Sequence, residues 1–136
     1  MRKFLIAAHG RFSSGMKSSL DFIVGETKNV YIIDAYVDSN KSIEDELHII
    51  VQDLRDDDEL IVMSDLMGGS ITNQVLRFAL KQNVHVVSGI SLGLVIEIVM
   101  GDETIAAAEV IENAITNARE QMVYVNKLIN KENDNA

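Results

Sequence analysis

The sequence places a histidine and an aspartate at the ends of two separate apolar runs. His9 follows the run KFLIAA, and Asp65 follows the run LIVMS. An aspartate that accepts the N–H of one imidazole nitrogen fixes the tautomer of the ring and leaves the other nitrogen with a nucleophilic lone pair. Gly68, Gly69 and Ser70 follow shortly after the aspartate, where backbone amides and a hydroxyl at the start of a helix can bind an anion. A nucleophile, an orienting acid and anion donors together indicate phosphoryl transfer.

The stretch AAHGRFSSGMKSS around His9 also comes close to a nucleotide-binding loop. That motif requires G-x-x-x-x-G-K-[ST], and Gly10 and Gly15 have the right spacing. Met16 stands where the lysine belongs, and Lys17 comes one position late, which turns it by about 100° on a helix. We therefore favour His9 as the reacting group and assign Gly10 to the close approach of a phosphoryl group at the strand end.

Two other classes of phosphate-binding protein agree less well with the sequence. A response-regulator receiver also carries an aspartate after its third strand, but it needs an acidic pair after the first strand to hold Mg²⁺. This chain has Ala8, His9 and Gly10 at that place. A flavin site is disfavoured because the chain has no tryptophan and only 5% aromatic residues to stack on the ring system.

The elements that must position these residues alternate along the chain. Nearly continuous apolar runs predict strands over 3–8, 30–35, 60–64 and 84–88, and apolar residues at helical spacing predict helices over 13–24, 42–54 and 70–82. Ser42 is the expected N-cap of the second helix. Right-handed crossovers then give an α/β three-layer sandwich with a mainly parallel sheet of order 2-1-3-4. In that order the first and third strands are neighbours, so His9 and Asp65 meet where the strand order reverses.

The C-terminal third is harder to assign. Residues 104–120 have helical composition, whereas QMVYVNKLI from Gln121 has β-branched and aromatic residues in alternation. We favour a final strand there over a continuing helix. Residues 1–130 are expected to form one domain, and residues 131–136 a polar tail.

Composition narrows the class of protein further. The chain has 136 residues, no cysteine and a net charge of −9, so thiolate chemistry and the commonest zinc sites are excluded and nucleic-acid binding is disfavoured. The longest nearly uncharged apolar run, residues 90–100, is shorter than the ~20 residues that span a bilayer. The short apolar start, which resembles a signal peptide, soon meets His9 and Gly10. We expect a cytoplasmic protein.

Two segments together resemble a known family. FLIAAHG at the N-terminus and VMSDLMGGS near the middle are similar to the enzyme IIA domain of the mannose (mannose/fructose/sorbose) family of the bacterial phosphoenolpyruvate:sugar phosphotransferase system. The segment VVSGISLGLVIEIV resembles the fourth strand and following helix of that family. The chain departs from the family pattern at Leu66, where threonine is frequent, and at Ile71, where proline is frequent.

The resemblance implies specific roles and partners. His9 would accept a phosphoryl group from phosphohistidine on the carrier HPr and pass it to a IIB component, which acts with the membrane components IIC and IID. Asp65 would orient His9, and Ser70 would lie near the phosphoryl group. Arg11 either contacts that group or points to solvent and a docking carrier. The resemblance implies no cofactor and no metal, and it implies a homodimer in which a C-terminal strand crosses to the partner's sheet.

The same resemblance leaves a regulatory function open. Domains of this type also occur in transcription activators and in dihydroxyacetone kinase systems, where they are phosphorylatable regulatory modules. The sugar that such a system transports cannot be identified from this component, because other subunits select it.

Overall fold

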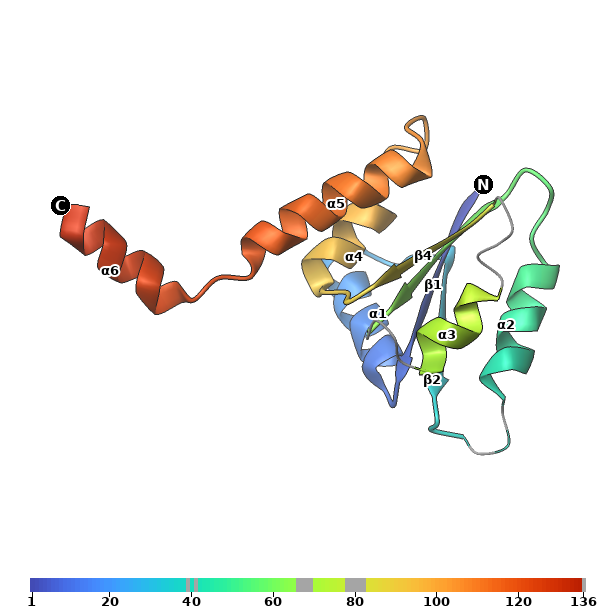
Figure 1. Ribbon diagram of the computed structural model, residues 1–136. Coiled ribbons are helices and arrows are strands. Elements are labelled where there is room, and N and C mark those ends of the chain that lie inside the picture. Colours follow the sequence, from blue (N-terminus) through green and yellow to red (C-terminus); the bar gives the residue numbers. More distant parts are fainter. Residues whose placement is uncertain (39, 41, 66–69, 78–82, 136) are drawn as a thin grey trace.

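The computed structural model describes residues 1–38, 40, 42–65, 70–77 and 83–135, with the side chains of 70 and 131–135 excepted. Strands and helices alternate along most of this length (Figure 1). In chain order the elements are β1 (Arg2–His9), α1 (Phe12–Val24), β2 (Val30–Ala35), α2 (Ile43–Gln52), β3 (Glu59–Ser64), α3 (Ser70–Leu76), β4 (Val84–Ser88), α4 (Leu92–Val99), α5 (Ala107–Gln121) and α6 (Val125–Asn135).

The four strands form one parallel sheet in the order β2-β1-β3-β4, as predicted. β1 lies between β2 and β3, with His9 opposite Ala35 on one side and Ala7 opposite Ser64 on the other. The carboxyl ends of β1 and β3 therefore lie side by side. This register brings His9 next to the residue that follows Ser64.

Helices cover both faces of the sheet, which confirms the predicted three-layer sandwich (Figure 1). Residues alternate along β1, so that Phe4 and Ile6 pack toward α1, α4 and α5, whereas Leu5 and Ala7 pack toward α2 and α3. The first layer buries Leu20, Leu94, Val95, Ile98, Ile111 and Ala114, and the second buries Ile43, Leu47, Val51, Ile71 and Val75. The two cores fix the strand ends from both sides.

Two helices begin with a serine cap. The Ser42 hydroxyl accepts a hydrogen bond from the Asp45 backbone N–H at 3.4 Å, which confirms the predicted N-cap of α2. Ser91 caps α4 in the same way by accepting from the Leu94 N–H at 3.3 Å. α4 follows β4 as the family resemblance implied. Its buried apolar face then closes the core beside α5.

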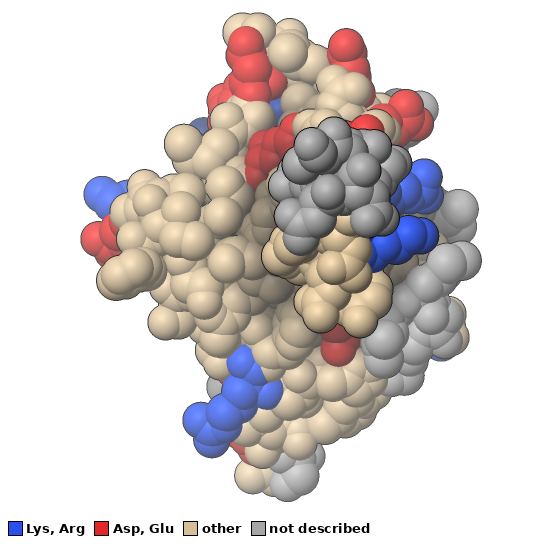
Figure 2. All heavy atoms as spheres, turned by 90° about the vertical axis from the view of Figure 1, so that its left-hand side faces the viewer, with Lys and Arg blue, Asp and Glu red and all other residues tan. Residues whose placement is uncertain are grey.

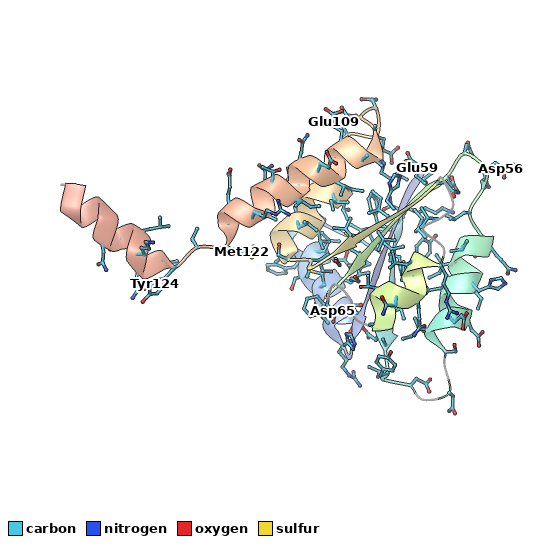
Figure 3. All side chains as sticks on the ribbon, viewed as in Figure 1. Asp56, Glu59, Asp65, Glu109, Met122 and Tyr124 are labelled. Carbon is cyan, nitrogen blue, oxygen red and sulfur yellow. The ribbon has the colours of Figure 1, made fainter. Side chains whose placement is uncertain are left out.

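The strand predicted from Gln121 is wrong for the single chain. α5 continues to Gln121, a short linker follows, and Val125–Asn135 form α6. The apolar residues Val125, Leu128 and Ile129 have helical spacing, and a segment without a neighbouring strand satisfies its backbone hydrogen bonds within itself. α6 extends away from the sheet (Figure 1), with the labelled Met122 and Tyr124 on the linker (Figure 3). Of the helices described, none combines the length and apolar character needed to cross a membrane.

Candidate functional site

His9 and Asp65 meet at the carboxyl end of the sheet, as predicted. His9 is the last residue of β1, and Asp65 directly follows β3, where Figure 3 labels it. The Nδ1 atom of His9 lies 2.9 Å from Oδ2 of Asp65. The backbone N–H of His9 donates to the same oxygen at 3.1 Å. The aspartate thus binds both the main chain and the ring of the histidine.

The ionisation of Asp65 determines the state of the imidazole. Partial burial raises the pKa of the Asp65 carboxyl, but the hydrogen bonds from the His9 backbone and ring outweigh burial and hold the pKa below its ordinary value. An ionised carboxylate only accepts hydrogen bonds, so Nδ1 of His9 carries the proton. In the neutral ring Nε2 then has a free lone pair. The His9 side chain is 39% exposed, so part of the ring is accessible to a partner.

Gly10 turns the chain from β1 toward α1. Its φ is +59°, in the left-handed region that side chains disfavour, and its N–H donates to the Ala35 carbonyl at 2.9 Å. A Cβ added to Gly10 would have nothing within 4 Å, so the backbone conformation rather than space requires glycine. The assignment of Gly10 to phosphoryl binding stays a prediction.

The start of α1 lies beside this turn. The backbone N–H of Ser14 donates to Oδ1 of Asp34 at 2.9 Å, so a carboxylate from β2 occupies the helix N-terminus. Arg11 precedes the helix and is exposed. In the part of the chain that the structure describes, the Arg11 guanidinium makes no hydrogen bond or ion pair. Lys17, which nearly completed a nucleotide loop, lies on α1 and pairs with Asp21 at 2.7 Å.

The predicted anion donors follow β3. Gly68 and Gly69 lie outside the described residues, and Ser70 is described only as the first residue of α3. A contact that sequence reasoning missed links β3 to this helix: the buried hydroxyls of Ser64 and Thr72 lie 2.8 Å apart. This bond joins the residue before Asp65 to the first turns of α3. The roles of the two glycines and Ser70 in phosphoryl binding stay predictions.

Tyr36 is a further residue at the site, and no pattern in the sequence indicated it. It follows β2 with a φ of 66°, and its ring centroid lies 5.6 Å from that of His9, with the two planes tilted by 36°. Aromatic residues rarely adopt a positive φ, and no turn motif in the sequence around Tyr36 predicts one. Tyr36 also lines two cavities, of about 240 and 410 Å³, whose walls include residues of α2.

The arrangement as described supports covalent chemistry on nitrogen. An oriented imidazole with an unprotonated Nε2, beside an ionised aspartate, is an activated nucleophile. Among the described residues, no group of three or more histidine, aspartate and glutamate side chains is placed to hold a metal ion. The chemistry supported by these groups is the transfer of a group onto His9.

Comparison with known proteins points to one family. Residues 3–115 match the family model EIIA-man, described as the fructose IIA component of the phosphotransferase system (PTS). A similar solved structure, with a TM-score of 0.85 and 31% identity, is that of a Klebsiella pneumoniae protein assigned as a phosphoenolpyruvate-dependent sugar PTS permease. That match covers 94% of this chain and 93% of the other.

Two streptococcal structures agree with this match. A PTS component EIIA from Streptococcus agalactiae is 29% identical with a TM-score of 0.79, covering 93% of this chain and 99% of that one. A PTS IIA protein associated with the fucose utilisation operon of Streptococcus pneumoniae is 29% identical with a TM-score of 0.76, covering 94% and 96%. The similarity therefore extends over nearly the whole of each chain.

Proposed function

The chain belongs to the EIIA-man family of phosphotransferase-system IIA components, and we propose that it is the phosphoryl carrier that links HPr to a IIB component. Family membership implies phosphotransfer in a sugar phosphotransferase system. The observation that carries the finer assignment is the 2.9 Å contact between Nδ1 of His9 and Asp65, which leaves Nε2 as the reacting atom. The phosphoryl group therefore resides on Nε2 of His9.

The transfer step follows from this geometry. The Nε2 lone pair attacks the phosphorus of phosphohistidine on HPr, the new N–P bond forms, and the N–P bond to the donor histidine breaks. The donor histidine keeps the electron pair of the broken bond. The Nδ1 proton stays on the His9 ring, which becomes more positive, and the Asp65 carboxylate stabilises that charge. The same step in the other direction, with a nucleophile of the IIB component as acceptor, returns His9 to its free state.

The reaction as proposed requires no cofactor or metal. The phosphoryl group arrives on a phosphohistidine, which is already an activated donor, so the carrier has to orient its own nucleophile rather than activate a phosphate ester. We place this exchange in the cytoplasm.

We also propose that the chain acts as a homodimer. Within the described sheet, β4 pairs with β3 on one side only. Beyond its other edge, β4, α4 and α5 line a cavity of about 350 Å³ whose walls include Val86, Leu94, Ile115 and Met122. The C-terminal segment carries exposed apolar side chains at Met122, Val123, Tyr124, Val125, Leu128 and Ile129.

A second copy of the chain suits this surface. Figure 2 views the molecule from the side of α5 and α6 and shows acidic side chains near its top and a largely uncharged surface in the left part of the view. The C-terminal segment of one copy can cover the cavity of the other, because that pairing buries apolar surface on both.

Phosphorylation in a reconstituted system tests the carrier function. The protein is incubated with phosphoenolpyruvate, enzyme I and HPr, and acid-labile phosphate on it is measured. We expect His9→Ala to lose the label. His48→Ala is the matched control, because His48 lies exposed on α2 with its Nε2 2.9 Å from Gln52. Label that persists in His9→Ala overturns the assignment.

Onward transfer distinguishes the carrier from the regulatory alternative. A carrier and a regulatory module would both be phosphorylated on the same histidine, so labelling of His9 alone does not distinguish the two functions. We expect the labelled protein to lose its phosphate when a IIB component is added. A label that no IIB component removes favours the regulatory module of dihydroxyacetone kinase or transcription-activator type.

A further inference from the structure

Tyr36 lies beside the ring of His9. It follows β2, which pairs with β1 on the side away from β3 and Asp65. We propose that Tyr36 is a positioning residue, whose aromatic ring holds the His9 imidazole in the orientation that presents Nε2 to a phosphoryl donor. The inference rests on the proposed function, because the orientation of Nε2 matters only if His9 accepts a phosphoryl group. The contact on which it depends is a property of the fold.

The backbone of Tyr36 is held in place by the end of the sheet. Ala35 pairs with His9 in the β1–β2 register, and its carbonyl accepts the Gly10 N–H at 2.9 Å. Tyr36 follows directly, so its Cα is fixed next to the end of β1. The distance of 5.6 Å between ring centroids lies within the 4.5–7 Å range of favourable aromatic pairs.

The conformation of Tyr36 carries a cost that ordinary turn residues avoid. Its φ of 66° is readily adopted by glycine, asparagine or aspartate, but it is strained for an aromatic residue. Burial does not explain the tyrosine either, because the residue is 61% exposed. Strained residues cluster at functional sites, where the side chain is needed in that position. At Tyr36 the side chain contacts the reacting histidine.

Together, Tyr36 and Asp65 restrain the imidazole from two neighbouring strands. Asp65, after β3, binds Nδ1, and this hydrogen bond still permits the ring to rock about it. Tyr36, after β2, packs against the ring and limits that motion. A nucleophile held near its attack geometry reacts faster than one that must be oriented in each encounter.

Replacing the tyrosine ring does not open a hole in the core. Tyr36 borders a cavity of about 240 Å³ that is also lined by Asp34, Val37, Ile43 and Glu46. Asparagine and glycine both adopt a positive φ without the strain of tyrosine. Tyr36→Asn and Tyr36→Gly are therefore expected to fold with an unfolding midpoint at or above that of the unchanged protein.

Three variants at this position test the proposal. With phospho-HPr as donor, we expect Tyr36→Asn and Tyr36→Gly to lower kcat by about three- to tenfold with little change in KM, the effect of one lost aromatic pair. Tyr36→Phe keeps the ring and should retain the original kcat. A kcat that is unchanged in Tyr36→Asn, or a loss shared equally by Tyr36→Phe, overturns the role of the ring.

A measurement without any partner separates this inference from the carrier function. In NMR spectra of the labelled protein, the carbon-bound protons of the His9 ring sense the ring current of Tyr36. We expect their shifts to change in Tyr36→Asn and to be preserved in Tyr36→Phe. Tyr31→Thr is the matched control, because it removes an aromatic ring from β2 at the position opposite Leu5. It should leave the His9 shifts unchanged. If the unchanged protein accepts no phosphate, the carrier function fails, while unchanged His9 shifts in Tyr36→Asn overturn the positioning contact itself.

Discussion

One oxygen of Asp65, Oδ2, lies within hydrogen-bonding distance of both the backbone nitrogen and the Nδ1 of His9, at 3.1 and 2.9 Å. A single carboxylate therefore fixes the end of β1 and the tautomer of the ring attached to it. The arrangement depends on β1 and β3 being neighbours in the sheet, because 56 residues separate the two side chains in the chain. Orientation and protonation of the proposed nucleophile are thus set together.

Replacing Asp65 by asparagine is expected to slow phosphoryl transfer by about 100-fold or more, a loss within the range of general acid–base effects. The asparagine oxygen can still accept from the His9 backbone N–H and from Nδ1, but the neutral amide no longer stabilises the positive charge that the ring gains when Nε2 receives the phosphoryl group. Rapid-quench measurement of transfer from phospho-HPr gives the rate, and circular dichroism confirms the fold. Transfer at the original rate in a folded Asp65→Asn protein would remove Asp65 from the mechanism.

The lowered pKa of Asp65 also predicts how stability depends on pH. A carboxyl whose pKa is lower in the folded than in the unfolded protein stabilises the fold above the unfolded value, about 3.9, and this stabilisation is lost as pH falls through the folded pKa. The difference in the free energy of unfolding between the original protein and Asp65→Asn should therefore be constant near neutral pH and shrink below about pH 4. Urea titrations between pH 3 and 7 measure it. A difference that does not change over this range contradicts an Asp65 carboxylate stabilised by its hydrogen bonds in the folded protein.

Much of the fold could be predicted because its signals are local or follow from general rules of topology. Apolar runs gave four strands, with β2 and β4 found at the predicted residues 30–35 and 84–88. The Ser42 cap could be read from its hydroxyl and position. The meeting of His9 with Asp65 followed from the strand order alone, since parallel strands place their carboxyl ends at one edge.

The features that were missed depend on contacts between distant segments. Nothing around Tyr36 predicts a positive φ, because β2 and its neighbour fix that backbone rather than the residue itself. The pairing of Ser64 with Thr72 likewise forms only when α3 packs on β3. At Gln121 the pattern was ambiguous: β-branched residues favoured a strand, while Val125, Leu128 and Ile129 also have the spacing of the helix that is observed.

Gly10 is expected to be required for its backbone conformation. Gly10→Ala should lower the free energy of unfolding by about 1 kcal/mol, because alanine is disfavoured at a φ of +59° although it has space for its Cβ. Gly15→Ala is the matched control. Gly15 lies inside α1 with equally open space, and alanine there should stabilise the protein by about 0.5–1 kcal/mol. Urea unfolding of both variants measures the two changes, and equal effects of the same sign would refute the conformational argument.

The proposed dimer makes a prediction about two neighbouring residues of α6. Leu128 is 48% exposed on the single chain, and Lys127 beside it is also exposed. If the apolar C-terminal segment covers the partner, a charge at Leu128 must be desolvated in the dimer, so Leu128→Glu should shift the protein toward monomer. Lys127→Glu changes the net charge by more than Leu128→Glu does, but it removes no apolar surface. It should therefore leave the dimer intact. Light scattering after size exclusion should give about twice the 15.1 kDa chain mass for the original protein and for Lys127→Glu, and a lower mass for Leu128→Glu at the same concentration. A monomeric original protein would exclude the proposed dimer. Equal dissociation of both variants would exclude association through the apolar side of this segment, because charge rather than buried surface would then govern it.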